Sequence, residues 1–342
     1  MRIGFHLNYT QSDNALAGLA LASQISRAGH DISILSRGTR SRSVDPHFDN
    51  KVINHKSISF WDWAQKQDII IWTHAVPVEV IQVLKQLEIK TVIYSLWDEL
   101  SKDVKLAYRV VDMVASPIMQ NAIQLREMWK IKKSYYWPLN LNLPITLKED
   151  ITNKDLKVLV PICGSQIYVQ YSEVFDMLNR IIKNTKNTKF TLLTSKRFAA
   201  FANKAVEQLQ KENEVTVIKD PDWIEQVKLY SNHDLVVKCS VRDNCNLIPL
   251  VSAALGTPLI TLDLPPINET PGSKHMFLSE CMKTSNEFKV PLARPDYNSF
   301  TSEVIELCEN REKINKAHVD LSKEFKHYHK LSKDGLTMTI ED

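Results

Sequence analysis

The chain has 342 residues, 44% hydrophobic and 24% charged, which is the composition of an ordinary globular protein. Because single cores usually divide above roughly 250–300 residues, we expect two domains. The net charge of +3 does not by itself indicate a nucleic-acid binder, and no apolar run approaches the ~20 residues of a membrane helix. The five scattered cysteines form no Cys-x-x-Cys pair, and the first residues resemble a strand rather than a signal peptide. We therefore expect a cytoplasmic protein without a disulfide framework.

Apolar runs alternate with helical patterns along almost the whole chain, which is typical of parallel α/β units. The predicted strands of the first half are Arg2–Asn8, Asp31–Leu35, Lys51–Asn54, Asp68–Thr73, Thr91–Leu96 and Asp112–Ala115. Its clearest predicted helices are Asn14–Ala28, which Gly29 ends, and Pro77–Leu87. Residues 1–145 carry 17 Lys/Arg and 13 Asp/Glu, a balance of +4, against 26 and 27 in residues 146–342, a balance of −1. An anionic macromolecule is therefore expected on the first half.

The same alternation of strands and helices begins again in the second half, after a proline-containing linker, Trp137–Asp155. Its predicted strands are Leu156–Ile162, Phe190–Thr194, Val215–Ile218, Leu235–Lys238 and Pro258–Leu262. Its predicted helices are Ser172–Lys183, Ala199–Asn213, Trp223–Ser231, Leu247–Leu255 and Arg311–Lys330. The predicted fold class is α/β, with two Rossmann-like domains facing a cleft. We expect the domains over residues 1–145 and 146–310, and a helix and tail over 311–342 that return towards the first domain.

The loops after the strands are the places to search for a site, because ligands bind at the carboxyl ends of parallel strands. The first loop lacks the Gly-x-Gly-x-x-Gly of a dinucleotide site, and no Walker-type phosphate loop occurs. In the second half Gly164 and Ser165 join a strand to a helix, where backbone N–H groups can approach a pyrophosphate. Lys196 and Arg197 follow the next strand and could supply charge to phosphates. The alternatives are a tight turn without a ligand and solvated surface charges.

Residues 242–260 (RDNCNLIPLVSAALGTPLI) comprise a loop, a short apolar helix, a glycine stop and a buried strand. This stretch, with the preceding unit at 217–237, resembles the donor site of GT-B glycosyltransferases. The resemblance implies a nucleotide-sugar co-substrate, a UDP-sugar above others, and no required cofactor or metal.

The chain departs from the family pattern at two points. The paired glutamates of the family would fall on Asp243 and Val251. Because valine cannot hold a ribose, we expect either that Ser252 or another residue does so, or that the donor differs. The usual basic pair is missing from Gln166–Glu173, so phosphate charge must come from elsewhere, with Lys274 one further candidate. The donor-binding residues that the resemblance implies are Gly164, Ser165, Lys196, Arg197, Ile218, Lys238, Arg242, Asp243, Asn246, Leu247 and Ser252.

The run 93–100 (IYSLWDEL) resembles an aromatic-rich strand of T-even phage DNA β-glucosyltransferases, which ends in the aspartate that serves as catalytic base. The resemblance makes Asp98 or Glu99 the candidate base, because an inverting transfer needs a carboxylate that takes the proton of the acceptor hydroxyl. Asp98 could instead cap the following helix. His74 also follows a predicted strand and is a third candidate, with a purely structural histidine as its alternative.

Acceptor-binding candidates gather after the first strands of the chain. Arg37, Arg40 and Arg42 share a loop with Ser, Thr and Gly, a composition suited to phosphates because guanidinium groups form charge-assisted hydrogen bonds. Asp13 and Trp97 complete the predicted acceptor set. A second basic and aromatic cluster, residues 130–137, and the arginine loop could each be plain solvated surface.

The function predicted from these features is transfer of a hexose or pentose from a nucleotide sugar to a hydroxyl group. The preferred acceptor is double-stranded DNA with a hydroxymethylated pyrimidine, as in phages, whose base must leave the stack to react. Such a phage enzyme would work in the cytoplasm of the host. The alternatives are a bacterial glycosyltransferase acting on a polysaccharide or lipid-linked sugar, and a non-catalytic relative that binds DNA or another partner.

Overall fold

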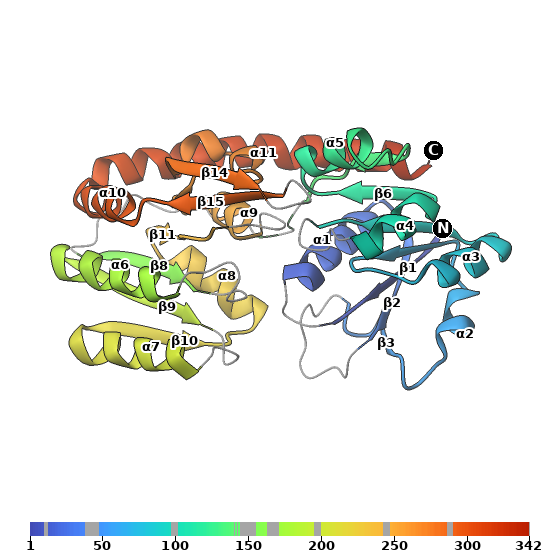
Figure 1. Ribbon diagram of the computed structural model, residues 1–342, viewed down its shortest axis with the longest axis horizontal. Helices are drawn as coiled ribbons and strands as arrows, with labels where there is room; N and C mark the ends of the chain where they lie inside the picture. Colours follow the sequence, from blue (N-terminus) through green and yellow to red (C-terminus); the bar gives the residue numbers. More distant parts are fainter. Residues whose placement is uncertain are drawn as a thin grey trace. The chain divides into compact units, whose positions relative to one another are not determined.

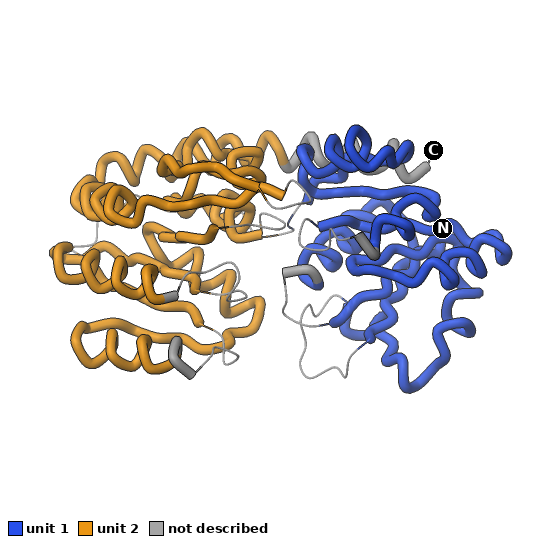
Figure 2. The backbone as a smooth tube through the Cα atoms, in the orientation of Figure 1, with its two compact units in different colours: residues 1–142, 329–342 blue, residues 143–328 orange. Residues whose placement is uncertain are grey.

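The computed structural model describes residues 1–9, 13–37, 48–96, 102–139, 141, 143, 155–162, 171–194, 200–241, 247–285 and 290–341. The chain divides into two compact units, residues 1–142 with 329–342 and residues 143–328 (Figure 2). Each unit holds one parallel sheet, of seven strands in the first and six in the second. The α/β class with two Rossmann-like sheets is therefore confirmed.

The first sheet has the strand order β3-β2-β1-β4-β5-β6-β7, and all neighbours are parallel (Figure 1). Its strands are β1 Arg2–Leu7, β2 Asp31–Ser36, β3 Val52–Asn54, β4 Ile69–Trp72, β5 Lys90–Tyr94, β6 Met113–Ser116 and β7 Ser134–Tyr136. Its helices are α1 Asp13–Arg27, α2 Phe60–Ala64, α3 Val78–Gln86, α4 Lys102–Val110 and α5 Met119–Glu127. The order reverses between β1 and β4, which makes their carboxyl ends the switch point of this sheet.

Helices α1 and α2 cover opposite faces of this sheet. A Cβ added at Gly4 of β1 would lie 2.7 Å from the Trp63 ring of α2. A Cβ added at Gly18 of α1 would lie 3.0 Å from Leu7, at the end of β1. Positions 4 and 7 differ by an odd number, so their side chains point to opposite faces. The two glycines therefore allow a helix to approach the central strand closely from each side.

The second sheet has the order β10-β9-β8-β11-β12-β13, again with parallel neighbours. Its strands are β8 Leu156–Pro161, β9 Thr188–Thr194, β10 Val215–Lys219, β11 Leu235–Val237, β12 Leu259–Leu262 and β13 Phe277–Ser279. The helices of this unit are α6 Tyr171–Asn184, α7 Ala200–Glu212, α8 Trp223–Asn232, α9 Leu247–Ala254, α10 Tyr297–Glu309 and α11 Arg311–Glu341, with 3₁₀ turns at Ile267–Glu269 and Ser273–His275. A hairpin of β14 Cys281–Ser285 and β15 Pro291–Pro295 is added. The switch point lies between β8 and β11.

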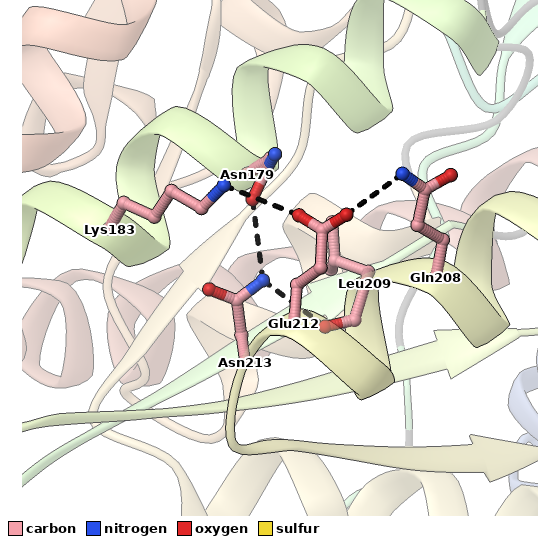
Figure 3. Close-up of polar contacts among 6 residues, drawn as sticks. All are labelled: Asn179, Lys183, Gln208, Leu209, Glu212 and Asn213. Atoms are coloured by element: carbon pink, nitrogen blue, oxygen red, sulfur yellow. Dashed lines mark hydrogen bonds and ion pairs between the residues drawn. The ribbon is translucent and has the colours of Figure 1, made fainter.

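Helix α6 shows how the core and the surface of this unit divide. Its residues Val174, Leu178 and Ile181 recur at helical spacing and are buried against the sheet. Its outer face meets α7 through polar contacts (Figure 3), in which Lys183 Nζ lies 3.3 Å from Glu212 Oε2. Asn213 Nδ2 also donates to Asn179 Oδ1 at 3.3 Å. Exposed pairs of this kind add little to stability because solvent screens them, so the buried apolar face holds the helix.

Several elements were not predicted from the sequence: α2, α5, α10, β7, β13 and the hairpin. Helix α4 was expected after Asp98, but without bounds. Helix α11 is longer than the predicted Arg311–Lys330, since it continues to Glu341, and residues 329–342 group with the first unit. Among the helices of the described residues, none combines the length and the apolar character needed to cross a membrane.

Candidate functional site

Three side chains of the first unit are associated with the switch point of its sheet. His6 stands near the end of β1, opposite Trp72 of β4 in the strand register. His74 follows β4 after one buried residue, and its ring centre lies 5.1 Å from that of His6, edge to face. Arg37 directly follows β2, and its backbone N–H donates to Leu7 O at 3.1 Å. Two of the three, His74 and Arg37, were predicted from the sequence, and His6 was not.

A hydrogen bond from Trp72 fixes the protonation of His6. The indole Nε1–H of Trp72 lies 3.1 Å from His6 Nδ1. Indole is only a donor, so His6 Nδ1 must accept and carries no proton. The neutral ring therefore holds its proton on Nε2. A polar residue inside the apolar run of the first strand was the sequence signal that could have singled out His6.

Burial and a nearby cation keep both imidazoles neutral. Burial, followed by the charges of Arg37 and His55, lowers the pKa of His6 to about 4. Burial, followed by His6 and Arg37, lowers the pKa of His74 to about 3. Proton abstraction is most efficient when the pKa of the base lies near the working pH, so His74 is a weak base at neutral pH. It suits a neutral hydrogen-bonding role.

The remaining predictions for the first unit fall at or beyond the edges of the described chain. Asp13 is the first residue of α1, and only its backbone is described. Arg37 is exposed. The predicted residues that lie outside the described part are Arg40, Arg42, Trp97, Asp98 and Glu99. The last three fall between β5, beside β4 in the sheet, and α4.

In the second unit, Lys238 stands at the corresponding switch point. It directly follows β11, and its backbone N–H donates to Ile260 O at 2.9 Å, which continues the pairing with β12. The residue is only 5% exposed. Lysine is rarely buried to this degree, because desolvation of an ammonium is costly. A cation held at the carboxyl end of a central strand can meet a bound phosphate.

Three further donor-site candidates lie on β10 and α9. Ile218 is half-buried, and its carbonyl accepts a hydrogen bond from Thr194 Oγ1 at 3.4 Å. Leu247 begins α9 and is buried. Ser252 is completely buried on the same helix, and its hydroxyl has no hydrogen-bond partner within the described residues. Lys274, the additional cation considered for the phosphates, lies 3.0 Å from Glu324 Oε2 and is already paired.

The Gly-Thr-Pro turn at 256–258 has a clear structural role. Gly256 has a φ of +65°, and an added Cβ would collide with Ser322 Oγ and approach His318 of α11. Its carbonyl accepts a hydrogen bond from His318 Nδ1. Thr257 Oγ1 donates to Tyr230 O at the end of α8, at 2.7 Å. The turn therefore joins α8, α9 and α11 at the start of β12, so its glycine does not by itself indicate a ligand.

The other donor-site predictions lie outside the described residues: Gly164, Ser165, Lys196, Arg197, Arg242, Asp243 and Asn246. The gaps that contain them follow β8, β9 and β11, the last after four further residues. Within the described chain, no group of three or more His, Cys, Asp or Glu is placed to hold a metal ion.

No protein-family model and no curated protein matches the chain. Solved structures do match over nearly its whole length. A sucrose-phosphate synthase from Thermosynechococcus elongatus has a TM-score of 0.71 at 12% identity, covering 100% of this chain and 98% of its own. The Anabaena protein Alr3699/HepE, solved with UDP-glucose, has a TM-score of 0.69 at 13% identity, covering 100% and 99%. The fold is that of the GT-B glycosyltransferases.

A third matching structure was solved with a nucleic acid bound. An α-glucosyltransferase solved with UDP and a 13-mer DNA containing an HMU base has a TM-score of 0.61 at 13% identity, with 95% of both chains covered. Identities this low establish the shared fold, and folds are shared by enzymes with different substrates.

Proposed function

We propose that this protein is a glycosyltransferase that moves a sugar from a nucleotide sugar, preferably a UDP-sugar, to a hydroxyl group of a hydroxymethylated pyrimidine in DNA. The observation that carries the proposal is the GT-B fold, matched over 95% or more of the chain by proteins solved with UDP-glucose, or with UDP and DNA. We assign binding of the donor to the second unit, residues 143–328, and binding of the acceptor to the first unit.

The donor assignment depends on the cation at the end of β11. Departure of a nucleoside diphosphate leaves negative charge that a positioned cation stabilises. Lys238 is buried at the switch point of its sheet and is suited to this task. Because the chain lacks the basic pair usual in this fold, Lys238 takes a larger share of the phosphate charge, with Lys196, Arg197 and Arg242 as further contributors. Gly164 and Ser165 supply backbone N–H groups, and Ile218, Asp243, Asn246, Leu247 and Ser252 complete the proposed donor set.

The acceptor assignment depends on the first unit. Asp98 is the proposed base, with Glu99 as the alternative, and takes the proton of the acceptor hydroxyl as the sugar carbon is attacked. The transfer then inverts the configuration at that carbon. His74 is neutral at pH 7 and orients the acceptor. The exposed guanidinium of Arg37, with Arg40 and Arg42, contacts phosphates, while Asp13 and Trp97 contact the acceptor base.

The direct test is to incubate the protein with a panel of nucleotide sugars and four DNA substrates, which contain cytosine, hydroxymethylcytosine, thymine or HMU, and to weigh the products. We expect a gain of one sugar on hydroxymethylated DNA alone and with one donor above the others. The unmodified DNAs are the controls: thymine lacks only the acceptor hydroxyl of HMU, and cytosine lacks the whole hydroxymethyl group of hydroxymethylcytosine.

Two alternatives give different products. A saccharide-directed enzyme, which the match to a sucrose-phosphate synthase of higher TM-score supports, would modify a saccharide and leave every DNA unchanged. A non-catalytic protein would neither modify DNA nor hydrolyse the donor in the absence of acceptor. Either result would refute the proposed DNA acceptor.

A further inference from the structure

A chain of ring contacts leads from the histidine pair of the first unit to an exposed tryptophan. The His6 ring lies 5.4 Å from the Phe60 ring, centre to centre, and Phe60 lies 5.0 Å from Trp61, edge to face. The ring centre of Trp63, which packs on the sheet, lies 5.9 Å from that of Phe60. The contacts thus pass from buried rings to an exposed one.

Only part of this aromatic group is needed by the core. Trp63 is buried over Gly4, and its indole donates to Ser33 Oγ at 2.9 Å, which anchors α2 to β1 and β2. Phe60 is half-buried, whereas Trp61 is 38% exposed. An exposed tryptophan next to a half-buried phenylalanine presents a large apolar surface that folding does not require. This surface is available to a ligand.

The start of α2 holds these two rings in a fixed position. Ser59 caps the helix by accepting from Asp62 N at 3.1 Å, and its hydroxyl donates to Asp62 Oδ2 at 2.7 Å. The carboxylate of Asp62 is therefore occupied with the cap. A rigid aromatic surface costs little conformational entropy when a ligand stacks on it.

Two exposed cations lie close to these residues, one beside the end of β1 in the sheet and one shortly before α2 in the chain. Arg37, which directly follows β2, is exposed, and its charge contributes to the lowered pKa of both His6 and His74. Lys56 is exposed three residues before the cap of α2. Aromatic rings interleaved with cations are the usual arrangement for unpaired nucleic acid, because bases stack on the rings while the cations contact the phosphates.

We propose that Phe60 and Trp61 form a stacking surface for an unpaired nucleobase of the acceptor DNA, with Arg37 and Lys56 contacting the flanking phosphates. The inference deepens the proposed function and rests on its DNA acceptor. Extrusion of the target base leaves unstacked bases, and a protein ring that stacks on one of them offsets part of the unstacking cost. Stacking on an aromatic ring depends little on base identity, so this surface sets affinity rather than sequence preference.

The test measures binding of a fluorescein-labelled single-stranded 13-mer with one HMU base, followed by steady-state transfer on the matching duplex. Trp61→Ala should weaken oligonucleotide binding about ten- to a hundredfold, because one stacking contact is lost. It should raise KM for DNA while the Kd for UDP stays unchanged. Trp61→Phe should restore most of the affinity, since it keeps a ring. Leu106→Ala, which removes another exposed apolar side chain of the same unit, is the matched control and should bind as the wild type does.

The possible results separate the inference from the proposed function. Equal oligonucleotide affinity in the wild type and Trp61→Ala would overturn the inference even if the DNA is glycosylated. A ring-dependent loss of affinity without any sugar transfer would support the inference and refute the proposed function. If the wild type binds no oligonucleotide, and Trp61→Ala instead weakens binding of an oligosaccharide, the assignment of this surface to a nucleobase is wrong.

Discussion

The switch points of the two sheets differ in charge and in what surrounds them. In the first unit the ends of β1 and β4 carry two neutral histidines, held by a tryptophan hydrogen bond and aromatic neighbours. In the second unit the end of β11 carries a buried lysine. The same strand order thus supports two chemistries, because the residues just after the strands can change without affecting the sheet. The difference agrees with the proposal that the first unit binds the acceptor and the second the diphosphate.

The largest expected effect is at the proposed base. Asp98→Asn removes the proton acceptor but keeps the size of the side chain, so sugar transfer should fall by about 10²–10⁴-fold while the affinity for UDP stays nearly unchanged. Transfer is followed by the mass of the DNA product, and UDP affinity by calorimetry. The matched variant Glu99→Gln should remain active. If Asp98→Asn is active and Glu99→Gln is not, the base is the neighbouring carboxylate; if both are active, neither of the two carboxylates is the base.

The second effect concerns stability in the unit that we assign to the donor. Gly256→Ala forces a side chain into the left-handed region and against Ser322 and His318, so it should lower the free energy of unfolding by about 3 kcal/mol. Gly29→Ala is the matched control, because Gly29 has a φ of +92° but nothing within 4 Å of an added Cβ. Gly29→Ala should lower the free energy of unfolding by only about 1 kcal/mol. Urea unfolding measures both.

A second variant tests the cause of this loss. Ser322→Ala removes the atom nearest to the added Cβ, so it should restore part of the stability of Gly256→Ala. Equal losses in Gly256→Ala and Gly29→Ala, with no effect of Ser322→Ala, would show that the contact with α11 is unimportant.

The third effect is the pH dependence of the stability of the first unit. The pKa of His6 is lowered to about 4, whereas an unfolded histidine has a pKa of about 6.5. Below pH 6.5 the unfolded chain therefore binds more protons than the folded chain. The contribution to stability is fully present above about pH 6.5 and is lost as the pH falls towards 4, on the order of 3 kcal/mol in total.

His6→Gln isolates this contribution, because glutamine keeps an acceptor for Trp72 but does not titrate. Its free energy of unfolding should fall less steeply than that of the wild type between pH 6.5 and 4, as measured by urea unfolding at each pH. Parallel curves for the two proteins would mean that His6 is not held neutral by its surroundings.

The fold could largely be predicted from the sequence, because the central strands are continuous apolar runs. β4, for example, is buried at all four positions. Elements that lack such a pattern were missed. Helix α2 has five residues, too few for a helical period, and its two tryptophans suggested neither a helix nor a site. The hairpin of β14 and β15 carries mixed exposed and half-buried residues.

The site was harder to predict than the fold. Lys238 and His74 could be named because Lys238 ends a recognisable predicted strand and His74 follows one, and ligands gather at strand ends. The role of His6 depends on a register that places it beside Trp72, 66 residues away, and such pairing is not visible in a local pattern. The Gly-Thr-Pro turn also has a role that a local pattern does not show, since Gly256 packs against α11, an element that follows it by more than 50 residues.

The division of roles between the two units is tested most directly by the Kd of UDP, measured by calorimetry on the wild type, Lys238→Met and His74→Asn. Methionine keeps the length of the lysine stem without its charge, so Lys238→Met should weaken UDP binding about 10- to 100-fold, as expected for the loss of a charged hydrogen bond. His74→Asn should leave the Kd unchanged. UDP binding that is weakened by His74→Asn but not by Lys238→Met, or that is absent from the wild type, would contradict the assignment.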